Sequence, residues 1–236
     1  MAAASDALEQ AILELIYQSD VTGQPWTAFG TTAGATSTDI YVALHSAYVT
    51  DAGAQNLNEL AYTGYARVAV TRNGTGGWTV GALAPGFQVT NTATTLFGTK
   101  TDAGSVEARY LTTGVASSGA TAVINRTHIG DAPEQFSVPA TGTTVNVPSH
   151  SLVNDDEVVL YETQGGSMPS GFSDGTEYFI VNSVAGVSVE LSATQGGAAI
   201  NSGSIGDGWI AKLSPLTIAQ SSAPQFLAGD IDFRIA

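Results

Sequence analysis

An arginine in a strand-like run is the first candidate for a residue with a chemical role. The run "TGYARVAV", residues 63–70, alternates from Tyr65 onward, so Tyr65 and Arg67 share one face of a strand. A guanidinium there could read a substrate or a nucleic acid, hold a neighbouring chain, or pair with a carboxylate. We expect the last role, with Arg67 beside an aromatic ring and bound to a carboxylate of its own chain or of another subunit.

A histidine and several acids are the next candidates. His45 ends a strand-like run, Asp51 follows in a loop and Glu59 opens the next run, and these three groups could in principle ligate a metal. Their spacing matches no metal motif, so a hydrogen-bonded histidine at a strand end is the favoured interpretation. Asp230 and Asp232 are expected on one strand face, as in paired catalytic carboxylates, but no partner residue accompanies them.

Other signatures of catalysis or ligand binding fail as well. The chain has no cysteine and no G-x-S-x-G sequence, and the cluster at residues 149–151, Ser-His-Ser, lacks an acid to orient it. Trp26, Trp78 and Trp209 could form sugar platforms, but single tryptophans in β proteins are mostly packed. We therefore predict no catalytic residue, no metal ligand and no cofactor, and a protein that is not an enzyme.

The overall charge limits the partners. The 236 residues include 7 Lys and Arg against 21 Asp and Glu, a formal net charge of −14. Such a surface repels phosphate backbones and anionic lipid headgroups, so neither nucleic acid nor a membrane is an expected partner. No apolar run approaches the ~18 residues of a spanning helix, and the N-terminus does not resemble a signal peptide. We expect a protein made in a cytoplasm and not exported by a cleaved signal.

One amphipathic helix is predicted near the N-terminus, over residues 6–18. Leu8, Ile12, Leu15 and Ile16 fall at i, i+4, i+7 and i+8, which places them on one apolar stripe. This stripe must pack on something. It either covers the protein's own sheet or docks as an arm on a neighbouring subunit.

The rest of the chain has the pattern of an all-β protein. Short runs rich in Thr, Val and Ala, such as "DIYVALHSA" at 39–47, alternate with Gly, Asn, Asp and Ser too closely for crossover helices. We predict an antiparallel β-sandwich or barrel body. A change to more regular strands near residue 131 indicates an inserted small β domain, so the expected units are 1–130, 131–212 and 213–236.

Two regions of the chain, roughly residues 39–130 and 213–236, resemble a known family. "IYVALHSAYVTDAG", "NEL" and "YTGYARVAVTR" are similar to a family of bacteriophage virion proteins, often labelled tail fibre proteins, whose pattern is L-Y-V-A-L-H-T-A-D-P, an acidic loop with N-E, then G-Y-A-R. "FLAGDIDFRI" at 226–235 is similar to the C-terminal strand of that family, and the expected insert is similar to small β modules of phage structural proteins. The matching positions are Tyr41, Val42, Ala43, Leu44, His45, Asn58, Glu59, Gly64, Tyr65, Ala66 and Arg67.

The resemblance implies a structural component of a virion, assembled in the host cytoplasm with other virion proteins as partners. A capsid decoration or cement protein is the preferred interpretation, because the chain has no long fibrous repeat and its negative charge suits the outer face of a shell. The alternatives are a tail fibre or tail adaptor protein in host attachment, and a glycan-binding or glycan-degrading virion component. We expect a homo-oligomer, with a trimer as the working hypothesis, in which Tyr65 and Arg67 have a structural role.

Overall fold

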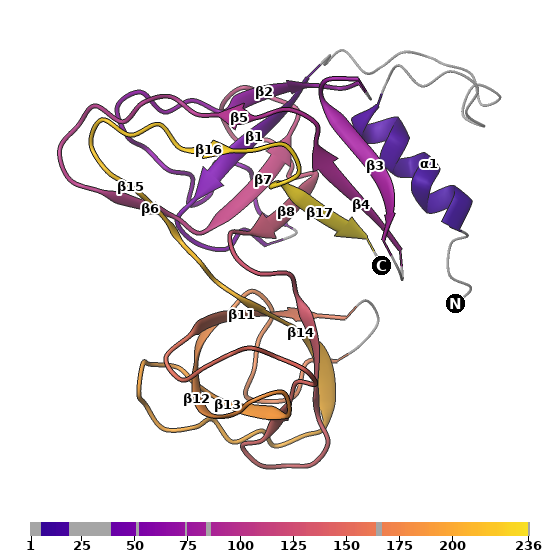
Figure 1. The fold of residues 1–236 in the computed structure, drawn as a ribbon, viewed down its shortest axis with the longest axis vertical. Helices are drawn as coiled ribbons and strands as arrows, with labels where there is room; N and C mark the ends of the chain where they lie inside the picture. Colours follow the sequence, from indigo (N-terminus) through magenta and orange to yellow (C-terminus); the bar gives the residue numbers. More distant parts are fainter. Residues whose placement is uncertain are drawn as a thin grey trace. The chain divides into compact units, whose positions relative to one another are not determined.

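The chain folds into two compact units of antiparallel strands. The structure is a computed structural model that describes residues 6–18, 39–50, 52–73, 75–83, 86–163 and 167–235. The first unit comprises residues 1–127 and 216–236, and the second comprises residues 128–215. The all-β fold class with one N-terminal helix is confirmed (Figure 1). The second unit begins three residues before the expected insert of 131–212 and ends three residues after it.

The first unit contains several separate sheets. One has four strands in the order β2-β1-β7-β8, another has three in the order β17-β4-β3, and two ribbons pair β15 with β6 and β16 with β5. Strand β1 lies inside the four-stranded sheet, and each of its residues from Val42 to His45 is buried. The bounds are β1 (Asp39–His45), β2 (Val68–Thr71), β3 (Trp78–Leu83), β4 (Gly86–Asn91), β5 (Thr95–Leu96), β6 (Val106–Ala108), β7 (Tyr110–Gly114), β8 (Asn125–His128), β15 (Leu216–Ile218), β16 (Gln225–Phe226) and β17 (Asp232–Ile235).

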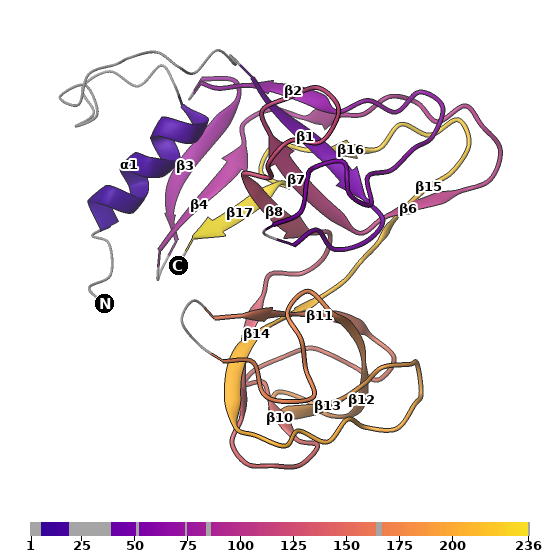
Figure 2. The ribbon, with the colours of Figure 1, turned by 180° about the vertical axis from the view of Figure 1, so that it is seen from behind.

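The helix packs on the three-stranded sheet through Leu13 and Tyr17. Helix α1 (Asp6–Tyr17) lies alongside β3 and β4 in both ribbon views (Figures 1 and 2). The Tyr17 ring meets Trp78 edge-on at a centroid distance of 5.0 Å and stacks on Phe233 at 6.5 Å. Its hydroxyl accepts a hydrogen bond from Asn125 Nδ2 at 2.8 Å, so one side chain of the helix links β17 with the chain segment at β8. Each aromatic pair contributes about 0.5–1.5 kcal/mol beyond its buried area.

The face that α1 turns to the sheet is not the stripe expected from the sequence. Ile12 and Leu15 are 39% and 48% exposed, Ile16 is half-buried, and the side chain of Leu8 lies outside the described residues. At about 100° per residue, Leu13 and Tyr17 lie on the opposite side of the helix from the expected stripe. The reason is that a tyrosine buries more area than a leucine or isoleucine and can also bond its hydroxyl inside. Ile12 and Leu15 of the expected stripe therefore face solvent.

An arginine holds the end of the helix. Arg72, just after β2, donates from Nε to the carbonyl oxygen of Ile16 and from Nη2 to that of Leu15, both at 2.6 Å. The last carbonyls of a helix have no partner within it, and a cation there also opposes the negative end of the helix dipole. Gln18 Nε2 donates to the Trp78 carbonyl oxygen at 2.8 Å. The C-terminal end of α1 is thus tied to β2 and β3.

The second unit is a closed six-stranded barrel with its own core. Its strands follow the order β10-β13-β12-β11-β14-β9, and β9 pairs with β10 to close it. Burial alternates along Glu177–Ile180 of β12 and Ser188–Leu191 of β13, as expected where every second side chain points inward. The bounds are β9 (Glu134–Val138), β10 (Val145–Asn146), β11 (Glu157–Glu162), β12 (Glu177–Val184), β13 (Ser188–Ser192) and β14 (Gly206–Lys212). The core consists of Phe136, Val138, Val145, Val147, Leu152, Val158, Leu160, Phe172, Tyr178, Ile180, Val189, Leu191 and Ile210.

The two chain segments that enter and leave the barrel pair with each other. Gly130 and Leu213 form an antiparallel bridge, Asp131 N–H donates to the Lys212 carbonyl oxygen at 3.0 Å, and Ser214 N–H donates to that of Ile129 at 2.8 Å. A Cβ on Gly130 would lie 2.0 Å from the Lys212 carbonyl oxygen, so this close approach requires glycine. The chain therefore enters and leaves the barrel at two adjacent, paired segments.

This pairing predicts that the first unit folds without the barrel. Because Gly130 and Leu213 face each other across two antiparallel segments, an Asn-Gly turn in place of residues 131–212 should connect them without strain. The shortened protein is expected to remain soluble and to melt cooperatively by circular dichroism. Residues 128–215 expressed alone serve as the counterpart and should also melt cooperatively, since they contain a complete core. Loss of cooperative melting in the shortened protein would show that the units depend on each other.

Candidate functional site

The Arg67 guanidinium is the centre of a buried polar network. Arg67 lies one residue before β2, and its side chain is 1% exposed. Nε and Nη2 donate to the two carboxylate oxygens of Glu59 at 2.8 and 2.7 Å, which is a bidentate pair. Nη1 donates to Gln55 Oε1 at 2.9 Å and to the Ala116 carbonyl oxygen at 3.0 Å, and Nη2 donates to that of Gly119 at 2.8 Å. All five N–H groups of the guanidinium are thereby satisfied.

Gln55 connects Arg67 to the first sheet. Gln55 Nε2 donates to the Tyr41 carbonyl oxygen of β1 at 2.9 Å, and Thr121 Oγ1 donates to Gln55 Oε1 at 3.2 Å. A Cβ on Gly114, at the end of β7, would lie 2.1 Å from Gln55 Oε1. Gly114 therefore leaves the space that the glutamine amide fills. The Gln55 amide thus connects Arg67 and the loop that contains Thr121 to strand β1. Gln55 and Thr121 are more than fifty residues apart in the sequence.

Tyr65 joins the same carboxylate to the backbone of β1. Its hydroxyl donates to Glu59 Oε1 at 3.0 Å and accepts a hydrogen bond from Leu44 N–H at 3.0 Å. Burial raises the pKa of the Tyr65 hydroxyl, so it remains a donor at neutral pH. Its ring stacks on Phe97 at a centroid distance of 6.2 Å. Arg67 and Tyr65 are thus linked through a shared glutamate in their own chain, and not by stacking of the guanidinium on the tyrosine ring.

The glycine of the G-Y-A-R element has a backbone role. Gly64 has φ +101°, and a Cβ there would lie 2.1 Å from the Thr99 carbonyl oxygen. An L side chain would therefore be both strained and in collision at this position. Gly64 fixes the turn that delivers Tyr65 and Arg67 to Glu59, while Ala66 between them is exposed.

His45 borders the network and makes two hydrogen bonds of its own. Its ring is buried, with Nδ1 2.9 Å from the Leu57 carbonyl oxygen and Nε2 2.7 Å from Thr112 Oγ1. Burial lowers the pKa of His45, against the opposing effect of the Leu57 carbonyl. Its backbone also bridges to that of Glu59. The structure therefore places a neutral, hydrogen-bonded histidine at the end of β1.

The three groups considered as metal ligands do not assemble into a metal site. Glu59 directs both carboxylate oxygens at Arg67, His45 points its ring nitrogens at Leu57 and Thr112, and Asp51 lies outside the described residues. Within the described ranges, no group of three His, Asp or Glu side chains could hold a metal ion. The chemistry of this cluster is charge neutralisation inside the protein.

Asp230 and Asp232 do not form a pair on one strand. Asp230 precedes β17 in a turn, where its Oδ2 accepts from Leu227 N–H at 2.7 Å, while Asp232 is the first residue of β17, opposite Thr90. The expectation of a shared strand face is therefore wrong, because β17 begins at Asp232 and Asp230 lies outside the strand.

The tryptophans form no common platform among the described residues. Trp78 is buried against Tyr17 and Phe233, and the half-buried Trp209 lies in β14 of the other unit. Trp26 lies outside the described residues.

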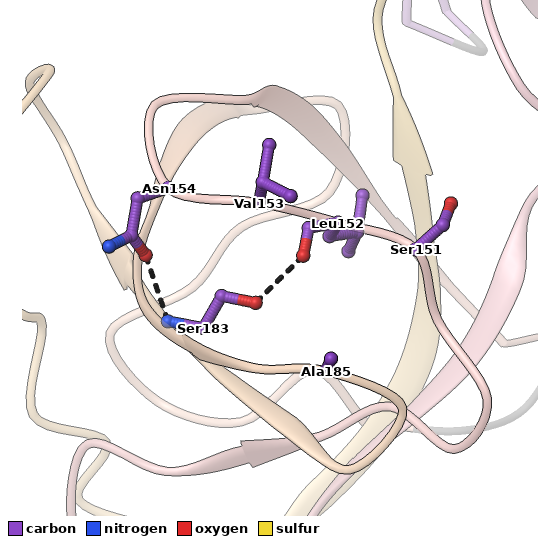
Figure 3. Close-up of a pocket in the computed structure, with 6 residues that line it drawn as sticks. All are labelled: Ser151, Leu152, Val153, Asn154, Ser183 and Ala185. Carbon is purple, nitrogen blue, oxygen red and sulfur yellow. Dashed lines mark hydrogen bonds between the residues drawn. The ribbon is translucent and has the colours of Figure 1, made fainter.

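A shallow groove lies at one end of the barrel. Ser151, Leu152, Val153, Asn154, Ser183 and Ala185 line it (Figure 3). Ser183 donates from its backbone N–H to Asn154 Oδ1 at 2.9 Å and from Oγ to the Leu152 carbonyl oxygen at 2.7 Å. The groove contains no charged residue, and its polar side chains mainly hold its own walls together.

Sequence reasoning missed several residues that the structure makes important. Gln55 and the carbonyl groups of Ala116 and Gly119 supply three of the five bonds to Arg67, and neither amide residues nor backbone acceptors leave a recognisable pattern. Lys100 is also buried, and its Nζ donates to the Asp102 carbonyl oxygen at 2.7 Å. A cation in an acidic chain is the available signal for Lys100 as well as for Arg67.

Comparison with known proteins adds no relative. No protein family, no curated protein and no solved structure matches this chain. The resemblance to phage virion proteins therefore stays a prediction. Among the described residues, no helix has the length and apolarity needed to cross a membrane.

Arg67→Lys tests the bidentate geometry of the network. An ammonium is a point charge that cannot make two parallel bonds to Glu59 and also reach the acceptors at Ala116 and Gly119, so the free energy of unfolding should fall by about 1–3 kcal/mol. Arg67→Ala should cost more, about 3–5 kcal/mol, because it leaves the glutamate uncompensated. Urea unfolding followed by circular dichroism measures both. Unchanged midpoints in both variants would contradict a structural role for Arg67.

Glu59→Gln tests the charge of the same pair without changing its shape. A neutral amide leaves the buried guanidinium uncompensated, and we expect a loss of about 3 kcal/mol in unfolding free energy. Glu107→Gln is the matched control, since the Glu107 side chain is 56% exposed and its ion pair with Arg109 is longer, at 3.6 Å. That variant should stay within about 0.5 kcal/mol of the parent. Equal losses in the two variants would mean that burial of the pair does not matter.

Proposed function

We propose that this protein is a structural component of a bacteriophage virion, and specifically a capsid decoration protein on the outer surface of the head. The observation that carries the proposal is that the residues of the family-like pattern meet in one network. Tyr41, Leu44, Glu59, Tyr65 and Arg67 come from three separate stretches of the pattern, and hydrogen bonds join them directly or through Gln55. Matching residues that bond to one another support a family resemblance more strongly than matching residues that do not interact.

The use of the polar groups supports a structural role. The guanidinium directs all of its N–H groups inward, and the carboxylate of Glu59 is shared between Arg67 and Tyr65. Groups that are fully engaged with their own chain stabilise a fold and have no bonding capacity left for a substrate. In this proposal, the G-Y-A-R element stabilises the position of β1 and its loops.

The surface supports assembly on the outside of a shell. Ile12 and Leu15 expose apolar side chains on α1, which offers a contact for other virion proteins or for further copies of this chain. The net charge of −14 disfavours contact with the packaged genome and is compatible with the outer face. We infer a homo-oligomer and retain three subunits as the working number.

Fractionation of particles tests the proposal. Virions of the phage that encodes this chain are separated into tailless heads and headless tails, and the protein is quantified in each fraction by mass spectrometry. We expect it on heads, in many copies per particle. Its presence on headless tails alone would favour a tail fibre or adaptor, and its absence from both fractions would overturn the virion proposal. Native mass measurement of the purified protein decides the number of subunits.

A further inference from the structure

A buried histidine joins two segments at the grooved end of the barrel. His150 is 4% exposed, its Nδ1 accepts from Leu152 N–H at 3.1 Å, and its Nε2 lies 3.1 Å from the Val184 carbonyl oxygen. Because Nδ1 accepts, the ring is neutral and its proton is on Nε2, from which it donates to Val184. The backbone of the same residue accepts from Gly186 N–H at 3.2 Å. His150 therefore joins the loop after β10 to the end of β12 through its ring, and to the turn between β12 and β13 through its backbone.

The backbone that this ring fastens is held in an unfavourable conformation. Ser149, Asp155 and Asn182 have φ values of 66°, 71° and 48°, in the left-handed region that non-glycine residues rarely adopt. Such residues persist where surrounding bonds fix them. The hydrogen bonds of His150 are among those that fix this end of the barrel.

The fastened end is apolar on its outside. Val153, which lines the groove, is 58% exposed (Figure 3). Val184 and Val187, on the segment that pairs with the loop, are 53% and 57% exposed, while Leu152 is buried. Opening of the loop would add Leu152 to this exposed surface and remove it from the barrel core. The conformation of the loop thus controls how much apolar surface this end presents.

No other titratable group on the facing segments competes with the ring. Residues 143–149 and 182–189, which pack against the loop, contain no acid, histidine, lysine or arginine. On the loop itself, the Asp156 carboxylate is paired with Lys212 Nζ at 2.7 Å, and Asp155 lies in the adjacent turn. On β13, Glu190 is bonded to Thr143 and Asn182.

We propose that His150 is an acid-sensitive latch for this end of the barrel. Uptake of one proton from solvent converts Nδ1 from an acceptor to a donor, so that two N–H groups face each other where Leu152 now bonds to the ring. The bond to the Leu152 N–H is lost, whereas the bond from Nε2 to Val184 and the bond from Ser183 Oγ to the Leu152 carbonyl oxygen can remain. The loop therefore loses one of its attachments.

Amide hydrogen exchange on the full chain tests the latch. Exchange is measured by NMR at about pH 7.5 and about pH 5, with intrinsic rates corrected for pH. We expect protection of the Leu152 amide to fall by about tenfold or more at the lower pH, while the amides of Val158 and Leu160 in β11 stay protected. Equal protection of Leu152 at both pH values would overturn the proposal. So would a parallel loss in β11, because that result describes unfolding of the whole barrel.

Two substitutions assign the effect to the ring. In His150→Asn the amide oxygen can still accept from the N–H two residues later, as in an Asx turn, and does not titrate, so the acid response of Leu152 should disappear. His128→Asn removes another buried histidine of the same unit and should leave that response intact. Persistence of the response in His150→Asn would rule out the latch. If His150→Asn does not fold, the wild-type comparison between Leu152 and β11 decides alone.

Discussion

An arginine buried inside a protein keeps its positive charge, so its surroundings must provide a carboxylate and an acceptor for each remaining N–H group. Arg67 imposes this requirement on the first unit. Glu59 supplies the charge, Gln55 supplies an amide oxygen, and two backbone carbonyls complete the set. Because these groups come from separate loops, the requirement fixes the course of the chain over a distance that short-range propensities cannot reach. The β1 sheet, its flanking loops and the tyrosine beside it are all arranged around this one cation.

The two glycines near the network show how narrow its tolerance is. Gly64 permits a left-handed turn, and Gly114 leaves room for an amide oxygen. Glycine is required at both positions because it has no Cβ, and not because its backbone is flexible. The buried polar network therefore depends on missing atoms as much as on hydrogen-bonding groups.

Much of the fold could be predicted from the sequence, because strand alternation and the 3.6-residue repeat are local properties. The all-β class and the extent of the helix, Asp6–Tyr17 against an expected 6–18, illustrate this. The buried face of the helix could not be predicted, since periodicity does not register that Tyr17 finds hydroxyl partners at Thr113 and Asn125. The partners of Arg67 could be anticipated in kind, as a carboxylate, but the amide and carbonyl acceptors depend on contacts between distant loops.

The closure of the barrel has a consequence for the proposed role on a capsid. Strands at the edge of an open sheet present unpaired N–H and C=O groups, which can recruit strands from other molecules. In the second unit, pairing of β9 with β10 uses up both edges. Such a unit can be crowded at high local concentration, as on a densely covered particle, without neighbouring copies joining into a continuous sheet.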